Sequence, residues 1–353
     1  MKKLVFLILL LHTFSFATSQ EMIKNSNIPL NSEGGRILKL EEVFELKDEP
    51  DKFFFAWPRN FCLDSQENLF ILDEDQLLKF SPEGRFMGNF YKKGQGPGEI
   101  STRYQMVSYV IHKDELYVYD GVARIIHMDN EGKVLDEIKQ TAGRYFQLVG
   151  IADKGFYMRY QTSARGETEG FLEIENQIFL LSPDGSFAKK IIGFFSQVYS
   201  GPNFGMDWDK YSNLFNQIDG SLYVTHSCEY KIVRADLNEG KIMVSFNREY
   251  PRIKYVIPED MEDFYKKYNP PKKKFENDVI KMYLNKNKLW IKTSTAKKDT
   301  GILFDVFDSQ GRYLDSFNLD INGELQLAAG DYLYITERDE EENILIKKLK
   351  ILN

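Results

Sequence analysis

A short unit that contains a glycine turn recurs along the chain and constrains its fold more than any other feature. In each copy an apolar strand with an aromatic residue is followed by a second strand, a polar turn closed by glycine, and a third strand. A hairpin of this kind needs a residue with positive φ where the turn rejoins the strand, and glycine adopts that conformation without steric cost. Five equivalent glycines indicate a repeat protein. They are Gly84, Gly132, Gly185, Gly240 and Gly311.

Six units can be traced, and each is preceded by a further apolar segment that is expected to form a strand. These segments span 57–63, 104–111, 145–152, 211–218, 279–284 and 323–328. Four strands per unit is the content of a propeller blade, and a single blade cannot bury both of its faces. We therefore predict an all-β, six-bladed β-propeller of four-stranded blades. A β-sandwich with accidental repetition is the alternative.

The two ends of the chain are expected to complete each other. The last unit, which ends with residues 344–349, lacks its outermost strand, whereas residues 36–46 have no blade of their own. Placing this N-terminal strand on the sixth blade closes the ring and removes an exposed strand edge. The predicted organisation is a signal peptide over 1–19, an N-terminal linker over 20–35 and the propeller over 36–353.

The first residues predict export. Lys2 and Lys3 precede an apolar core over 4–11, and the small residues Ser15 and Ala17 occupy the positions that signal peptidase reads. The apolar run is shorter than the roughly 20 residues that span a bilayer. No cysteine lies near the cleavage site, so we expect a periplasmic or extracellular protein that is not a lipoprotein and keeps no integral membrane segment after cleavage.

The net charge limits the class of partner, and the cysteine content limits the source of stability. The chain has 46 basic and 53 acidic residues and a net charge of −7. An acidic surface repels phosphate backbones, which argues against nucleic acid as the partner. Cys62 and Cys228 fall in units far apart around the ring, beyond the reach of a disulfide. The fold is therefore expected not to depend on one.

A glycine-rich loop, with the sequence GQGPGEI, joins the first unit to the second. Its members are Gly94, Gly96, Pro97, Gly98 and Glu99. The loop resembles the G-x-G-P-G-E-[FI] loop of six-bladed β-propeller proteins common in Bacteroidetes, which are related to NHL-repeat propellers. The resemblance covers essentially the whole mature chain through its repeat and implies an exported protein that binds or supports something at the cell envelope. A phosphate cradle would need a helix after the loop. Because a strand follows instead, we interpret the loop as a structural turn.

The residues that commonly hold metals do not form a recognisable motif. His112, His127 and His226 fall in two units and do not converge as zinc ligands would. Acidic runs over 73–75 and 339–342 lie in turns, where such residues are common. We therefore expect no metal and no cofactor. A calcium ion on the ring axis stays an open alternative that no motif supports.

Basic and aromatic residues stand together where the inner strands are expected to begin, at the mouth of the central funnel. Arginine binds carboxylates in a forked geometry, and aromatic rings offer stacking surfaces. The arrangement predicts recognition of an anionic or sugar-like ligand. The alternative is that these residues pack the crossovers between blades. The candidate ligand-binding residues are Arg59, Arg103, Tyr104, Arg144, Tyr145, Trp208 and Tyr211.

Two aromatic-rich insertions, 193–210 and 247–278, are expected to fold over one face as lids or partner surfaces. The second should contain a short helix over 259–268. We predict an exported binding or scaffold module rather than an enzyme, whose partner is a small molecule, a glycan or an envelope protein. The alternative is a metal-assisted lactonase or lyase, or a glycan-active enzyme, that uses the funnel. The fold alone does not decide between them, because propellers host many unrelated activities.

Overall fold

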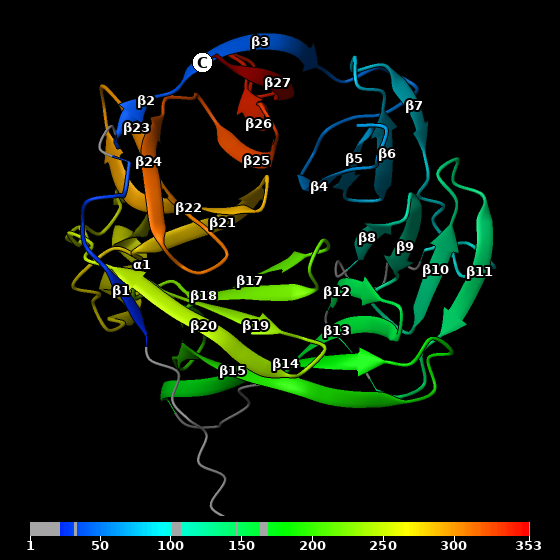
Figure 1. Ribbon diagram of the computed structural model, residues 1–353, viewed down its shortest axis with the longest axis horizontal. Coiled ribbons are helices and arrows are strands. Elements are labelled where there is room, and N and C mark those ends of the chain that lie inside the picture. The colour runs from blue at the N-terminus through cyan, green and yellow to red at the C-terminus, as the bar shows by residue number, and fades with distance from the viewer. Residues whose placement is uncertain are drawn as a thin grey trace, which may run out of the picture.

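Six β-sheets are arranged as blades around a central axis (Figure 1). The computed structural model describes residues 22–31, 34–100, 107–143, 145, 147–162 and 169–352, so the predicted signal peptide lies outside it. Within each blade, four strands form an antiparallel meander that runs from the axis to the rim. The predicted six-bladed β-propeller is therefore confirmed.

Blades 1 and 2 have four strands each, and blade 3 has five. Blade 1 consists of β4 (Pro58–Leu63), β5 (Leu69–Asp73), β6 (Gln76–Phe80) and β7 (Phe86–Asn89). Blade 2 consists of β8 (Ser108–His112), β9 (Glu115–Tyr119), β10 (Arg124–Met128) and β11 (Val134–Lys139). Blade 3 consists of β12 (Gln147–Ala152), β13 (Gly155–Gln161), β14 (Gly170–Leu181), β15 (Ala188–Ser200) and β16 (Gly205–Asp209).

Blades 4, 5 and 6 each take their outermost strand from the N-terminal segment. Blade 4 consists of β17 (Tyr211–Asn216), β18 (Ser221–His226), β19 (Lys231–Asp236), β20 (Lys241–Arg248) and β1 (Ile23–Asn25). Blade 5 consists of β21 (Val279–Asn285), β22 (Lys288–Lys297), β23 (Gly301–Phe307), β24 (Tyr313–Leu319) and β2 (Arg36–Ile37). Blade 6 consists of β25 (Glu324–Ala329), β26 (Tyr332–Arg338), β27 (Ile344–Leu352) and β3 (Lys39–Leu46).

The N-terminal segment closes the ring as predicted and also extends two further blades. β3 pairs antiparallel with β27, from Leu46 opposite Ile346 to Lys39 opposite Leu352, and the two strands lie side by side at the top of Figure 1. β1 and β2 pair parallel with β20 and β24. The stretch 20–35, expected as a linker, thus contributes a strand to blade 4. We call residues 22–31 and 34–46 the N-terminal strap.

The repeated glycines adopt the conformation that the hairpins require. Their φ angles lie between 65° and 85° at Gly84, Gly132, Gly185, Gly240 and Gly311. The sixth blade has the same turn, but Glu342 occupies the glycine position with a φ of 66°. A Cβ atom on Gly311 would lie 2.6 Å from the ring of Phe246 in blade 4, so at this turn glycine also allows close packing on the preceding blade.

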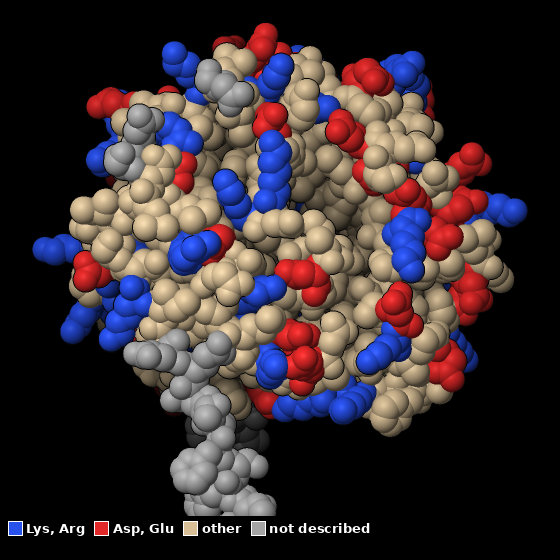
Figure 2. Space-filling model, in the orientation of Figure 1, with Lys and Arg blue, Asp and Glu red and all other residues tan. Residues whose placement is uncertain are grey.

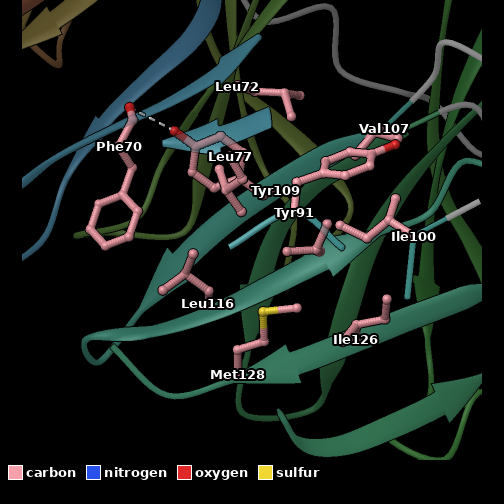
Figure 3. Packing of buried hydrophobic residues seen from close by; sticks show 11 residues of the cluster. Phe70, Leu72, Leu77, Tyr91, Ile100, Val107, Tyr109, Leu116, Ile126 and Met128 are labelled. Carbon is pink, nitrogen blue, oxygen red and sulfur yellow. Dashed lines mark hydrogen bonds between the residues drawn. The ribbon is translucent and has the colours of Figure 1, made fainter. Parts of the chain in front are cut away.

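Each interface between neighbouring blades has its own hydrophobic cluster. Figure 3 shows the cluster between blades 1 and 2, where Phe70 and Leu72 of β5 pack with Leu116 of β9 and Ile126 of β10. The Tyr109 hydroxyl donates a hydrogen bond to the Phe70 carbonyl at 2.9 Å. Because the core is spread around the ring in this way, it leaves the axis free to form a channel.

The two insertions differ from each other. Residues 193–210 do not form a separate lid: β15 continues to Ser200, and β16 adds a fifth strand to blade 3. Aromatic pairing along the longer hairpin supports this extension, with the rings of Phe171 and Tyr199 centred 5.3 Å apart. The second insertion contains the expected helical segment, as a 3₁₀ turn (Glu259–Met261) followed by α1 (Glu262–Tyr268).

Candidate functional site

The six inner strands surround a channel of about 550 Å³ on the ring axis, and Figure 2 shows the hollow at the centre of one face. Each inner strand (β4, β8, β12, β17, β21 and β25) opens its blade, so all six run in the same sense along the axis. Their first residues therefore gather at one end, which we call the mouth, and their last residues gather at the other end, which we call the floor.

The lining changes from mainly polar to mainly apolar along the channel. The side chains near the mouth include Arg59, Asn60, Gln147, Ser212, Asn213, Lys281 and Gln326. Those toward the floor include Leu63, Ile111, Phe215, Leu284 and Ala328, together with one polar side chain, Gln217, just after β17. The inner strands contribute both ends, so the polar and apolar parts of the lining are held in place by sheet hydrogen bonds rather than by loops.

Among the predicted binding residues that the structure describes, Arg59 is the one that lines the channel. Its guanidinium carbon lies 4.9 Å from the centre of the Trp57 ring, and its buried Nη1 atom has no hydrogen-bond partner among the described residues. Burial lowers the pKa of Arg59, although Asp73 opposes this effect. The carboxylate of Asp73 already accepts the backbone N–H groups of Ala56 and Trp57 at 2.9 and 2.7 Å. Arg59 therefore keeps donor capacity that its protein surroundings do not use.

Lys281 and Lys292 add further positive charge at the mouth. They are directly opposite each other on β21 and β22. The Nζ atom of Lys281 lies 3.2 Å from a carboxylate oxygen of Glu324 and 3.2 Å from the side-chain oxygen of Gln326. Burial lowers the pKa of Lys292; Glu324 opposes this shift and Lys281 adds to it. Like charges directly opposite in a sheet are destabilising, and the carboxylate of Glu324, which pairs with Lys281, offsets part of this repulsion.

Arg59, Lys281 and Lys292 belong to blades 1 and 5, which flank blade 6. Between them, blade 6 contributes Gln326 to the lining. We call these three basic residues the cationic arc. The remaining mouth residues named above, Asn60 on blade 1 and Gln147, Ser212 and Asn213 on blades 3 and 4, are uncharged.

The other predicted binding residues on blades 2 and 3 do not reveal a channel role. Arg103, Tyr104 and Arg144 lie outside the described residues. Tyr145 is buried in the hydrophobic cluster between blades 2 and 3. Its carbonyl accepts a hydrogen bond from the Tyr119 hydroxyl at 3.0 Å, so at this position the structure shows packing between blades.

Trp208 and Tyr211 are not among the residues that line the channel. Trp208 belongs to β16 at the outer edge of blade 3, where its ring is centred 4.9 Å from that of Phe171. It precedes an inner strand in the sequence, but β16 pairs with β15 and so holds it at the rim. Tyr211 is buried at the start of β17, and the guanidinium carbon of Arg159 lies 4.8 Å from the centre of its ring.

The glycine-rich loop between blades 1 and 2 is a closed turn that contacts blade 2. The Glu99 carboxylate accepts the N–H group of Gly96 at 2.8 Å, and the N–H group of Glu99 donates to the Gly96 carbonyl at 3.1 Å. Arg124 of β10 donates to the carbonyls of Gly96 and Glu99 at 3.0 and 2.7 Å. Gly98 has a φ of 70°, and a Cβ atom there would lie 2.6 Å from Val134. These contacts attach the loop to the neighbouring blade.

The histidines and cysteines are spread over the ring. The Nε2 atom of His127 lies 2.8 Å from a carboxylate oxygen of Glu115, and His226 pairs with Asp209 at 3.3 Å. Both cysteines are free thiols. Across the described ranges, no group of three or more His, Cys, Asp or Glu side chains is placed to hold a metal ion. In the same part of the chain, no helix reaches the length and apolar character needed to cross a membrane.

Structure comparison finds similar folds in proteins of Bacteroides. A putative exported protein from Bacteroides fragilis shares 13% identity over 94% of this chain and 100% of its own, with a TM-score of 0.51. A member of the DUF4221 family from Bacteroides vulgatus shares 11% identity over 90% of this chain and 99% of its own, with a TM-score of 0.56. No family model and no curated protein matches the sequence. The predicted likeness to Bacteroidetes propellers therefore holds for the fold, and the relation to NHL repeats stays a prediction.

Proposed function

We propose that the protein is a binding module of the cell envelope that takes a small ligand into its central channel. The observation that supports this most strongly is the channel lining, which is polar and basic at the mouth and mainly apolar at the floor. Small-molecule sites are typically concave, about 300–1,000 Å³ in volume, and largely apolar with a few fixed polar groups. The channel, at about 550 Å³, has these properties.

The location of the lining residues on inner strands favours a binding role. Side chains on strands are held more precisely than side chains on loops, and a preformed site loses less entropy when a ligand binds. All six blades contribute residues to the lining. A ligand in the channel would therefore contact every blade and would stabilise the closed ring as a whole.

The envelope location is part of the proposal and rests on the N-terminal sequence. Lys2, Lys3 and the apolar core over 4–11 have the form of a signal peptide, and a structurally similar protein from Bacteroides fragilis is described as a putative exported protein. Processing near residue 19 would leave only a few residues before β1, which is fixed on blade 4. Mass spectrometry of the protein recovered from the periplasm would show whether the leader has been removed.

A ligand screen with a filled-channel control tests the proposal. We would measure the melting temperature of the processed protein with sugars, sugar acids, amino acids and short organic acids. A ligand at 100 times its dissociation constant stabilises the fold by about 2.7 kcal/mol, which should raise the melting temperature by several degrees. The Gln147→Trp variant fills the mouth without changing its charge, and Asn213→Trp serves as a second filled variant.

The proposal predicts that a compound stabilises the native protein and that this effect is lost in both tryptophan variants, provided each variant folds normally by circular dichroism. If no compound stabilises the protein, or if stabilisation persists in the filled variants, the proposal is wrong. The alternative of an enzyme acting in the same channel would be favoured if the stabilising compound were chemically converted during incubation.

A further inference from the structure

We infer that the ligand of the channel is an amphiphilic oxyanion, with an anionic head held at the cationic arc and an apolar body directed toward the floor. This inference rests on the proposed function, because it assigns the chemical class of ligand for the same channel. Neither the basic mouth nor the apolar floor would favour such a molecule by itself. The two favour it together, because they follow one another along the same channel.

The head group is inferred from the charge at the mouth. Arg59 and Lys281 line the channel, and Lys292 is the cross-strand neighbour of Lys281. Arginine and lysine bind carboxylate, sulfate and phosphate oxygens through charge-assisted hydrogen bonds, which are stronger than neutral ones. The carboxylate of Glu324 contacts Lys281, and Asp73 is occupied by backbone N–H groups. An incoming oxyanion would therefore relieve repulsion between the lysines and engage unused donor capacity of Arg59.

The apolar body is inferred from the far half of the channel. Leu63, Ile111, Phe215 and Leu284 line the floor and are only half-buried. Covering such surfaces with an apolar group is favourable, because it removes apolar area from water. A sugar acid would instead place hydroxyl groups against these side chains, and buried hydroxyl groups without hydrogen-bond partners are costly. The floor therefore favours a hydrocarbon or aryl body over a sugar ring.

The length of the channel fits a medium-chain body. Arg59 and Leu63 of the inner strand β4 lie opposite Leu72 and Leu69 of β5, because a bulge between Arg59 and Cys62 adds one residue to β4. A strand rises about 3.3 Å per residue, so the three-residue span on β5 separates the arc from the floor by roughly 10 Å along the strand. A medium-chain carboxylate such as octanoate extends over a comparable distance and serves as the test ligand.

Isothermal titration calorimetry with four small compounds tests the inference. Octanoate has both the head and the body, 1-octanol has the body without charge, acetate has the head alone, and glucuronate has an anionic head on a sugar ring. We expect octanoate to bind at least tenfold more tightly than each of the other three. Inorganic phosphate, added as a competitor, distinguishes a mouth that accepts any oxyanion from one selective for carboxylate.

Variants of the arc connect the affinity to named residues. Arg59→Met, alone and combined with Lys281→Met and Lys292→Met, keeps much of the apolar stem of each side chain and removes the charge. We expect octanoate to bind at least tenfold more weakly to these variants and 1-octanol to be affected little. Lys288→Met is the matched control: Lys288 is the first residue of β22, four residues from Lys292 and opposite Asn285 at the floor end of β21, and the change should leave octanoate affinity unchanged.

The outcomes separate this inference from the proposed function. If glucuronate binds in the channel, as judged by loss of binding in Gln147→Trp, while octanoate does not, the inference is overturned and the binding module stands. If octanoate binds equally well with and without the arc, the inference is again overturned. If octanoate binds Gln147→Trp as tightly as it binds the native protein, it binds outside the channel and the inference is overturned. If the screen also yields no ligand whose binding depends on the channel, the proposed function is overturned as well.

Discussion

Replacing Asp305 by alanine removes the carboxylate that balances a buried arginine between blades 4 and 5. Asp305 of β23 is fully buried and accepts hydrogen bonds from Arg248 Nε at 2.7 Å and from the hydroxyls of Tyr230 and Tyr313 at 2.6 and 2.8 Å. The Arg248 side chain is only 4% exposed, and its guanidinium lies 5.0–5.3 Å from the ring centres of three tyrosines. Without Asp305, the arginine would stay charged in a site with little water.

The structure sets the size of the expected effect. Removing one partner of a buried ion pair costs about 3–5 kcal/mol, because an uncompensated charge remains. We therefore expect Asp305→Ala to lower the free energy of unfolding by about 3–5 kcal/mol, a large part of the stability of a typical domain. Replacing both partners, with Arg248→Met and Asp305→Leu, should cost less than Asp305→Ala alone, because no isolated charge is then left.

Urea denaturation, followed by tryptophan fluorescence and by circular dichroism, measures these differences. Asp315→Ala is the matched control: Asp315 lies on β24 of the same blade and pairs with Arg36 at 2.8 Å, but the two side chains are 18% and 44% exposed. Exposed pairs of this kind contribute less than about 1 kcal/mol. If Asp305→Ala and Asp315→Ala lower the free energy of unfolding by similar amounts, the argument from burial is refuted.

Three further measurements test other parts of the structure. Glu342→Gly should raise the free energy of unfolding by up to about 1 kcal/mol in urea denaturation, because it relieves a left-handed backbone, whereas Glu341→Gly should give no gain. Asn25→Ala removes three hydrogen bonds that join the strap to blades 4 and 5 and should lower the same quantity by about 1–2 kcal/mol; no loss would mean that the strap contributes little. Burial raises the pKa of the Cys62 thiol to about 11. Alkylation of Cys62 by iodoacetamide, measured by peptide mass spectrometry, should therefore be slow at pH 8 and become faster up to about pH 11. Rapid labelling at pH 8 would contradict this.

The sequence predicted the blades well, because each hairpin has a local physical requirement that is visible in the residues. Gly311 and its equivalents mark positions of positive φ, and the apolar strands follow at regular spacing. The same signal missed the turn of the sixth blade, where Glu342 adopts the glycine conformation. It also missed β1 and β2, since strands of three and two residues have no periodicity and depend on the edges of β20 and β24 that they cover.

The candidate site was less predictable, because its residues are brought together by register rather than by motif. Arg59 was found from its neighbour Trp57 near the start of an inner strand. Lys281 and Lys292 were not, because they face each other only through the pairing of β21 with β22. Trp208 was expected at the mouth from its position before β17, but its strand pairs outward with β15. Local sequence does not show which edge a short strand will join.

A crystal structure of the protein with octanoate bound would show whether the channel binds the ligand and in which direction. We predict electron density along the ring axis, with the carboxylate within hydrogen-bond distance of Arg59 or Lys281 and the hydrocarbon chain against Leu63 and Phe215. Density at the rim of the ring, or a ligand with its carboxylate at the floor, would contradict the assignment of the channel and of its polarity.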